Sequence, residues 1–290
     1  MKNDKKSFTF LRLTIGVGLL VFLFYQIDFI GAIKLFNRIN YLILIPILLY
    51  LPALWISMIR LNFFLDNKIN FYKLLKTYWI SSFFSNFLPG NVAGDSYKVI
   101  VFRKQIGTKE ILKGVIFDRF SGLTAMLFVA SILSFLVFNI TKNVYFILIP
   151  ILLFIVTILA IFSPLHSYLI KIKSVEFLKR YIDEFKDKFV LSSILSIIFF
   201  VLGAISLWSY YYMFGYNVDF LLVLAFYSAI QIVNSIPISI NGWGLREGSI
   251  IYLFSLILIP FEVSLSIALL SRMVMLLQTS IGGLIYLFEK

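Results

Sequence analysis

Long apolar stretches, separated by short polar or charged ones, run along the whole chain. Two of them, about 71–89 and 220–237, end at Pro-containing turns and are followed by short apolar stretches at about 94–105 and 244–259. The others come close to the ~20 residues that a helix needs to cross the hydrocarbon core; they cover about 10–27, 41–59, 115–139, 144–162, 191–214 and 263–288. The pattern predicts an all-α polytopic membrane protein with about six full spans and two re-entrant helical hairpins.

The two turns are copies of one another. NFLPGNVAGDSYK begins at Asn86 and NSIPISINGWGLR at Asn234, and both fit Asn-x-x-Pro-x4-Gly-x3-Lys/Arg at a constant offset of 148 residues. Paired segments interrupted by Gly and Pro in the two halves of a membrane protein indicate a central substrate site. The alternative is two ordinary loops that are similar by chance.

The distribution of Lys and Arg predicts the topology. The N-terminus carries Lys2, Lys5, Lys6 and Arg12 and is expected in the cytoplasm, as is the C-terminus at Lys290. The basic group between 98 and 113 stays cytoplasmic only if the first hairpin folds back. The second hairpin then enters from outside. We therefore expect one transmembrane domain over 1–290, built from inverted-repeat halves at about 10–139 and 144–288. Between the spans, amphipathic interfacial segments are expected at about 28–39 and 163–189.

Composition supports this class and narrows the chemistry. The chain is 61% hydrophobic with a mean hydropathy of +0.97. It has no cysteine and a single histidine, His166, so disulfides, thiolate catalysis, a His-based triad and a multi-His metal site are excluded, and no cofactor is expected. The net charge of +12 fits cytoplasmic loops and anionic lipid, and does not favour nucleic acid, because the cations are spread among hydrophobic spans.

Repeat-equivalent cations are the first candidates for a binding site. Lys98 and Arg246 each follow a glycine-containing turn, near the predicted start of a short helix. Free N–H groups at a helix N-terminus, together with a cation, form a good anion receptor. Two such sites would suit a phosphate headgroup, although both side chains could instead extend to the interface. The turns contribute the remaining candidates, which are Asn86, Pro89, Gly94, Asn234, Pro237, Gly242, Trp243 and Gly244.

Charges close to or within the spans extend this set. Arg119 and Arg272 each follow the hairpin of their own half and are interpreted as a second equivalent pair, with Asp118 beside the first. Charged residues within spans usually face a bundle interior or a cavity, whereas charges near the headgroups would cost little. Asp95 and Glu247 could pair with a cation, take up a proton, or cap a helix.

The segments NFLPGNVAGDSYKVIVFRK, IFDRFSGL and NSIPISINGWGLREGSI resemble the transmembrane flippase-like family of lysylphosphatidylglycerol synthases, including its stand-alone members. The resemblance implies a membrane region that moves lipids between leaflets. Fused members also carry a soluble domain that transfers an amino acid from aminoacyl-tRNA. The sequence ends soon after the last predicted span, so a stand-alone membrane region is expected. Some relatives are linked to polyprenyl-phosphate pathways.

The resulting hypothesis is a lipid translocase, not an enzyme, in a prokaryotic plasma membrane. It would bind a phospholipid or a polyprenyl-phosphate lipid in a midplane cavity. One alternative is a membrane-embedded glycosyl or aminoacyl transferase that acts on a lipid. It would need Asp95, Asp118 or Glu247 as a base. The other alternative is a non-catalytic membrane subunit. A second copy of the chain or a separate lipid-modifying enzyme is the expected protein partner.

Overall fold

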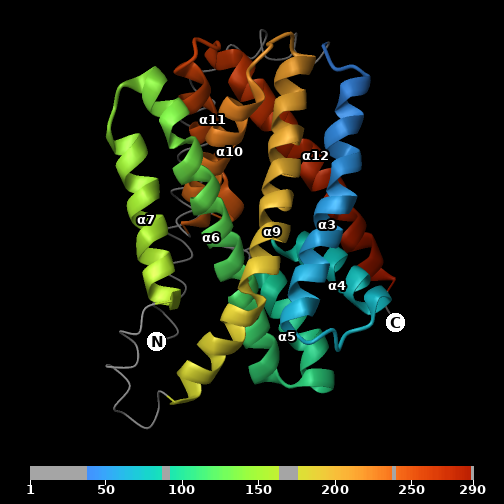
Figure 1. Cartoon of the computed structure of the whole chain (residues 1–290). Coiled ribbons are helices and arrows are strands. Elements are labelled where there is room, and N and C mark those ends of the chain that lie inside the picture. Colours follow the sequence, from blue (N-terminus) through green and yellow to red (C-terminus); the bar gives the residue numbers. More distant parts are fainter. Residues whose placement is uncertain (1–37, 87–91, 163–175, 237–239, 289–290) are drawn as a thin grey trace, which may run out of the picture.

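The computed structural model describes residues 38–86, 92–162, 176–236 and 240–288, and throughout these ranges the regular structure is helical (Figure 1). The predicted span at 10–27 and most of the predicted interfacial helix at 28–39 lie outside the described residues. The elements in chain order are η1 (Tyr41–Ile43), α3 (Leu44–Phe64), α4 (Phe71–Phe84), α5 (Val92–Ile106), α6 (Thr108–Thr141), α7 (Tyr145–Phe162), α9 (Glu176–Met213), α10 (Phe220–Ser235), η3 (Ile240–Gly242), α11 (Leu245–Ser255) and α12 (Phe261–Leu287).

Within the described residues, four helical stretches are long and apolar enough to cross a membrane. They are Tyr41–Phe64, Thr108–Thr141, Lys186–Met213 and Phe261–Leu287. The stretches at Tyr145–Leu159 and Phe220–Ser235 are apolar but shorter. Many large apolar side chains on these helices are exposed, among them Leu48, Phe135 and Leu277. Such exposure is expected of a surface that faces lipid, so the helices and their surface fit a helical membrane protein.

Helices α3 and α9 run antiparallel and mark the two ends of the bundle. At one end Lys188, near the start of the apolar part of α9, forms an ion pair with Asp66, just after α3. At the other end Arg38 donates a hydrogen bond to the carbonyl oxygen of Phe214, just after α9. The chain leaves α3 and α9 at these opposite ends, and from each end it enters a pair of short helices (Figure 1).

The first pair, α4 and α5, is an antiparallel hairpin. Near its open end Lys73 Nζ donates to Gln105 Oε1 at 2.9 Å. Near its closed end Gly94 packs so tightly on α4 that an added Cβ would lie 2.6 Å from the carbonyl oxygen of Ser81. Glycine is therefore required here by close backbone approach. Helix α5 begins at Val92, two residues before the predicted start at Gly94.

The second pair, α10 and α11, is also an antiparallel hairpin. Its helices are held along their length by Phe226 and Phe254, whose ring centroids lie 5.1 Å apart. Three residues of the turn have a positive φ. The values are 46° for Asn241, 73° for Gly242 and 79° for Gly244. This backbone ends the short 3-10 turn and allows α11 to start in a new direction.

The long helix α9 covers parts of two predicted segments. The amphipathic segment expected at about 163–189 and the span expected at about 191–214 are joined in one helix from Glu176 to Met213. The reason is local: the stretch has no proline and no glycine before Gly203, and most of its charged residues are Glu, Lys or Arg, which are good helix formers. The part of the predicted amphipathic segment at 163–175 lies outside the described residues.

Candidate functional site

The start of α11 holds a buried ion pair. Glu247 and Arg272 of α12 are only 1% and 3% exposed, and both the Nε and one terminal nitrogen of Arg272 donate to Glu247 Oε1, at 3.0 and 2.8 Å. The other oxygen of Glu247 accepts a hydrogen bond from the backbone N–H of Gly244 at 2.7 Å, which caps the helix. Glu247 therefore fills two of the roles considered for it from sequence, pairing and capping.

Arg272 also organises the turn before α11. Its second terminal nitrogen donates to the carbonyl oxygen of Asn241 at 3.0 Å. Its guanidinium carbon lies 5.0 Å from the ring centroid of Trp243, in a cation–π contact. One α12 side chain thus fixes Asn241, Trp243 and Glu247, and the turn is held in a single arrangement.

Arg246, which is adjacent to Glu247 in sequence, has different partners. One terminal nitrogen donates to Ser271 Oγ at 3.3 Å, and the other lies 3.9 Å from the sulfur of Met275. Both partners are neutral, and the structure gives Arg246 no ion pair with a carboxylate among the described residues. It is the second residue of α11, so the positive end of the helix dipole adds to its charge.

The equivalent cation of the first hairpin is paired. Lys98 Nζ lies 3.2 Å from Asp95 Oδ1 and 4.3 Å from the ring centroid of Tyr78. Asp95 is shared, because Nε of Arg119 on α6 donates to its Oδ2 at 2.6 Å. Lys98 is the seventh residue of α5 and not at its first turn, which is occupied by Asp95. Lys98 and Arg246 therefore occupy the same repeat position but different electrostatic environments.

Asp118 is bound by a residue that sequence reasoning did not select. Arg60 of α3 donates from Nε and one terminal nitrogen to the two carboxylate oxygens, at 2.5 and 3.0 Å, and from the other terminal nitrogen to Ser196 Oγ at 2.7 Å. Arg60 comes directly after the span predicted at 41–59, and it is buried within α3. Its position in the apolar run LWISMIRLNFF, which is the criterion that selected Arg272, was the available signal.

The two turns touch one another. Asn241 Nδ2 donates to Asn86 Oδ1 at 2.9 Å, and Asn86 Nδ2 donates to Thr279 Oγ1 of α12 at 2.9 Å. The contact does not follow the repeat, in which Asn86 corresponds to Asn234. Asn234 lies instead beside the second turn, where its Oδ1 would be 3.0 Å from a Cβ added to Gly242. Pro89 and Pro237 lie outside the described residues.

Two groups of charges therefore lie on the hairpins and on the helices that follow them. Arg60, Lys98 and Arg119 surround Asp118 and Asp95 on the side of the first hairpin, and Arg246 and Arg272 accompany Glu247 on the side of the second. Arg119 and Arg272, predicted as an equivalent pair, both bind the carboxylate of their own hairpin. With five cations and three carboxylates, the described set has an excess of positive charge that suits an anion.

A family model described as the lysylphosphatidylglycerol synthase TM region matches residues 9–283 of this chain. The match covers both hairpins and every described helix named above up to the last turn of α12. No curated protein and no solved structure matches the chain.

Proposed function

The chain belongs to the family of lysylphosphatidylglycerol synthase transmembrane regions, so it is an integral membrane protein with a lipid-related function, and we propose that it is a lipid translocase. In this proposal it moves a lipid with a phosphate in its headgroup, a phospholipid or a polyprenyl-phosphate, between the two leaflets. The headgroup passes between the two hairpins while its chains stay in the bilayer.

Arg246 is the observation that carries the proposal. Within the described residues the other candidate cations are bound by carboxylates, whereas Arg246 contacts a hydroxyl and a thioether. A partly buried guanidinium with only neutral partners is expected to bind an anion in preference to remaining unpaired. The planar guanidinium fork fits two oxygens of one phosphate.

The arrangement of the hairpins supports a transport mechanism. We propose that both are re-entrant, that they enter from opposite sides of the membrane as an inverted repeat, and that 1–290 forms one transmembrane domain with cytoplasmic termini. Their starting points at opposite ends of the α3/α9 pair and the contact between Asn86 and Asn241 support this interpretation. In secondary transporters of this architecture, broken helices meet near the midplane and one half rocks against the other. The contact between Asn86 and Asn241 would break as the headgroup passes.

The alternative of a lipid-linked transferase needs a carboxylate that can take up a proton. Asp95, Asp118 and Glu247 were the candidates, and each accepts charge-assisted hydrogen bonds from a cation. Each carboxylate is thus already engaged by a cation of the protein, and Glu247 also caps α11. This engagement favours translocation over covalent chemistry.

The test is lipid exchange in proteoliposomes that contain fluorescent phosphatidylglycerol or polyprenyl-phosphate, with a membrane-impermeant quencher outside. Arg246→Ala should lower the exchange rate by about tenfold to a hundredfold, the range expected for one or two charge-assisted hydrogen bonds. Arg246→Lys should recover only part of the rate, because an ammonium lacks the bidentate fork. The matched control is Arg103→Ala, an exposed arginine on α5, which should exchange lipid as the wild type does.

Wild-type exchange in Arg246→Ala would contradict the proposal. Mass spectrometry of the extracted lipids separates the alternatives: a new covalent product would identify a transferase. A protein that neither exchanges lipid nor forms a product would fit a non-catalytic subunit.

A further inference from the structure

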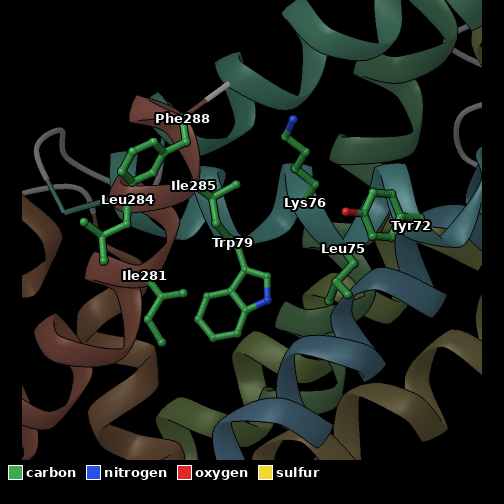
Figure 2. A pocket seen from close by; sticks show the side chains of 8 residues that line it. All are labelled: Tyr72, Leu75, Lys76, Trp79, Ile281, Leu284, Ile285 and Phe288. Carbon is green, nitrogen blue, oxygen red and sulfur yellow. The ribbon is translucent and has the colours of Figure 1, made fainter. Parts of the chain in front are cut away.

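A groove of about 470 Å³ lies between α4 and α12, outside the charged site (Figure 2). Its apolar wall includes Leu75 and Trp79 of α4 and Ile281 and Leu284 of α12. The two helices meet closely at its base, because a Cβ on Gly282 would collide with the carbonyl oxygen of Trp79. The volume is within the ~300–1,000 Å³ typical of small-molecule sites.

The groove has a polar end and an apolar end. Figure 2 shows the ammonium of Lys76 at one end and the rings and chains of Trp79 and Ile281 toward the other, with the hydroxyl of Tyr72 directed inward. Lys76 and Tyr72 are the residues with polar side-chain ends in the wall on the side of the α4 N-terminus. An amphipathic groove of this kind matches a molecule with one anionic group and an apolar chain.

The polar end faces the basic end of the bundle. Lys76 lies one turn beyond Lys73, which contacts Gln105 at the open end of the first hairpin, so the two lysines are separated by about 4.5 Å along the helix axis. Lys68 and Lys104 lie at the same end, near the open end of this hairpin. Anionic lipids concentrate where basic residues border a membrane surface. The charge of this end therefore complements a negatively charged headgroup.

We propose that this groove binds one anionic phospholipid, with its phosphate at Lys76 and an acyl chain along Trp79 and Ile281. The proposal deepens the proposed function, and rests on it for the class of lipid, by naming a site where lipid docks before it reaches the charges between the hairpins. Helix α12 connects the two places. Ile281 lines the groove, and Thr279, two residues earlier on the same helix, binds Asn86 at the tip of the first hairpin.

The fluorescence of Trp79 reports whether a lipid chain lies in the groove. The chain has four tryptophans, and replacing Trp55, Trp208 and Trp243 by Phe leaves Trp79 as the single fluorophore. The protein is reconstituted in vesicles with increasing fractions of phosphatidylglycerol or phosphatidylcholine that carries bromine on its chains, which quenches a neighbouring indole. Size-exclusion elution and the thermal midpoint check that each variant is folded.

Brominated phosphatidylglycerol should quench Trp79 in a saturable manner, at about a fivefold lower mole fraction than brominated phosphatidylcholine does. A preference of about fivefold is what the attraction between one lysine and an anionic leaflet is expected to produce. Lys76→Gln should reduce this ratio to about one, and Lys76→Arg should retain it, because the charge is retained. Lys142→Gln, which changes an exposed lysine directly after the end of α6, is the matched control and should keep the preference.

Equal quenching by the two lipids in the starting protein would overturn the proposal, because it would mean that Trp79 faces only bulk lipid. A preference that survives Lys76→Gln would overturn it as well. Lipid exchange is measured separately, in the protein that keeps all four tryptophans, because Trp243 contacts Arg272 in the candidate site. Preserved quenching with no lipid exchange in that protein would contradict the translocase and leave the groove, and exchange without preferential quenching would contradict the groove alone.

Discussion

Removal of Glu247 should destabilise the protein far more than removal of an exposed carboxylate. Glu247→Ala leaves the guanidinium of Arg272, which is 3% exposed, without its counter-charge. Two unit charges about 4 Å apart attract by about 4 kcal/mol at an effective dielectric constant near 20. Breaking a buried pair by removing one partner costs about 3–5 kcal/mol, in agreement with that figure. The Gly244 N–H also loses its acceptor.

Taking about 4 kcal/mol as the loss, the thermal midpoint should fall by roughly 10 °C, at the 2–4 °C per kcal/mol typical of large domains. The measurement is thermal unfolding of purified protein in detergent, followed by size-exclusion chromatography. The matched control is Glu110→Gln, which removes the partner of Lys113 in a pair on α6 where the glutamate is 43% exposed. Such pairs contribute about 0–1 kcal/mol.

A double-mutant cycle separates the pair from the cap. Glu247→Gln with Arg272→Met removes both charges and keeps an amide oxygen that can accept from Gly244 N–H. This double variant should be more stable than the sum of the two single losses predicts, by at least about 2 kcal/mol, because no charge is left buried alone. A midpoint for Glu247→Ala within 2 °C of the Glu110→Gln control, or a coupling energy near zero, would refute the reasoning.

Three further predictions concern the turn, the pH dependence and the topology. Gly242→Val should abolish lipid exchange while membrane abundance stays normal, because φ is +73° and a Cβ would lie 3.0 Å from an amide oxygen; Leu256→Ile is the control, and equal exchange in both variants would mean an ordinary loop. The pKa of Asp66 is lowered, mainly by its hydrogen bond from a lysine on α9, so its stabilisation is present above 3.8 and is lost as the pH falls through the lowered pKa. Asp66→Asn should therefore reduce stability slightly, by less than about 1 kcal/mol, at pH 7, and the difference should shrink as the pH is lowered below 3.8, as thermal unfolding over a series of pH values would measure. A cysteine at position 104 should react with an impermeant reagent from the cytoplasm and one at 217 from outside, and outside labelling at 104 would exclude the first re-entrant hairpin.

Local signals in the sequence were sufficient for most helices. The hairpin at α10 and α11 was predicted at 220–237 and 244–259 and is observed at Phe220–Ser235 and Leu245–Ser255. Apolar runs, helix breakers and capping residues act within a few neighbours, so they can be interpreted without knowledge of the fold. The change from a mixed-charge segment to a span near residue 190 lies within the one helix α9, because charged residues alone do not end a helix.

The sequence could not predict which charged residues contact one another. Arg246 and Glu247 are adjacent along the chain, yet Glu247 binds Arg272, which is 25 residues away, and Arg246 contacts a serine and a methionine of the same helix. Adjacent residues on a helix point about 100° apart, so proximity in sequence does not imply contact. The role of Arg60 was missed for a related reason: its carboxylate partner lies 58 residues away on another helix.

The sequence by itself determined the class of protein, the two interrupted hairpins and the residue types in them, because hydrophobic length and glycine or proline at a turn act locally. Only the tertiary structure decided which charges neutralise one another and which cation keeps neutral partners. It also decided that the two turns meet through Asn86 and Asn241, which are 155 residues apart. Those contacts depend on how helices pack across the bundle, and that packing is a property of the whole chain.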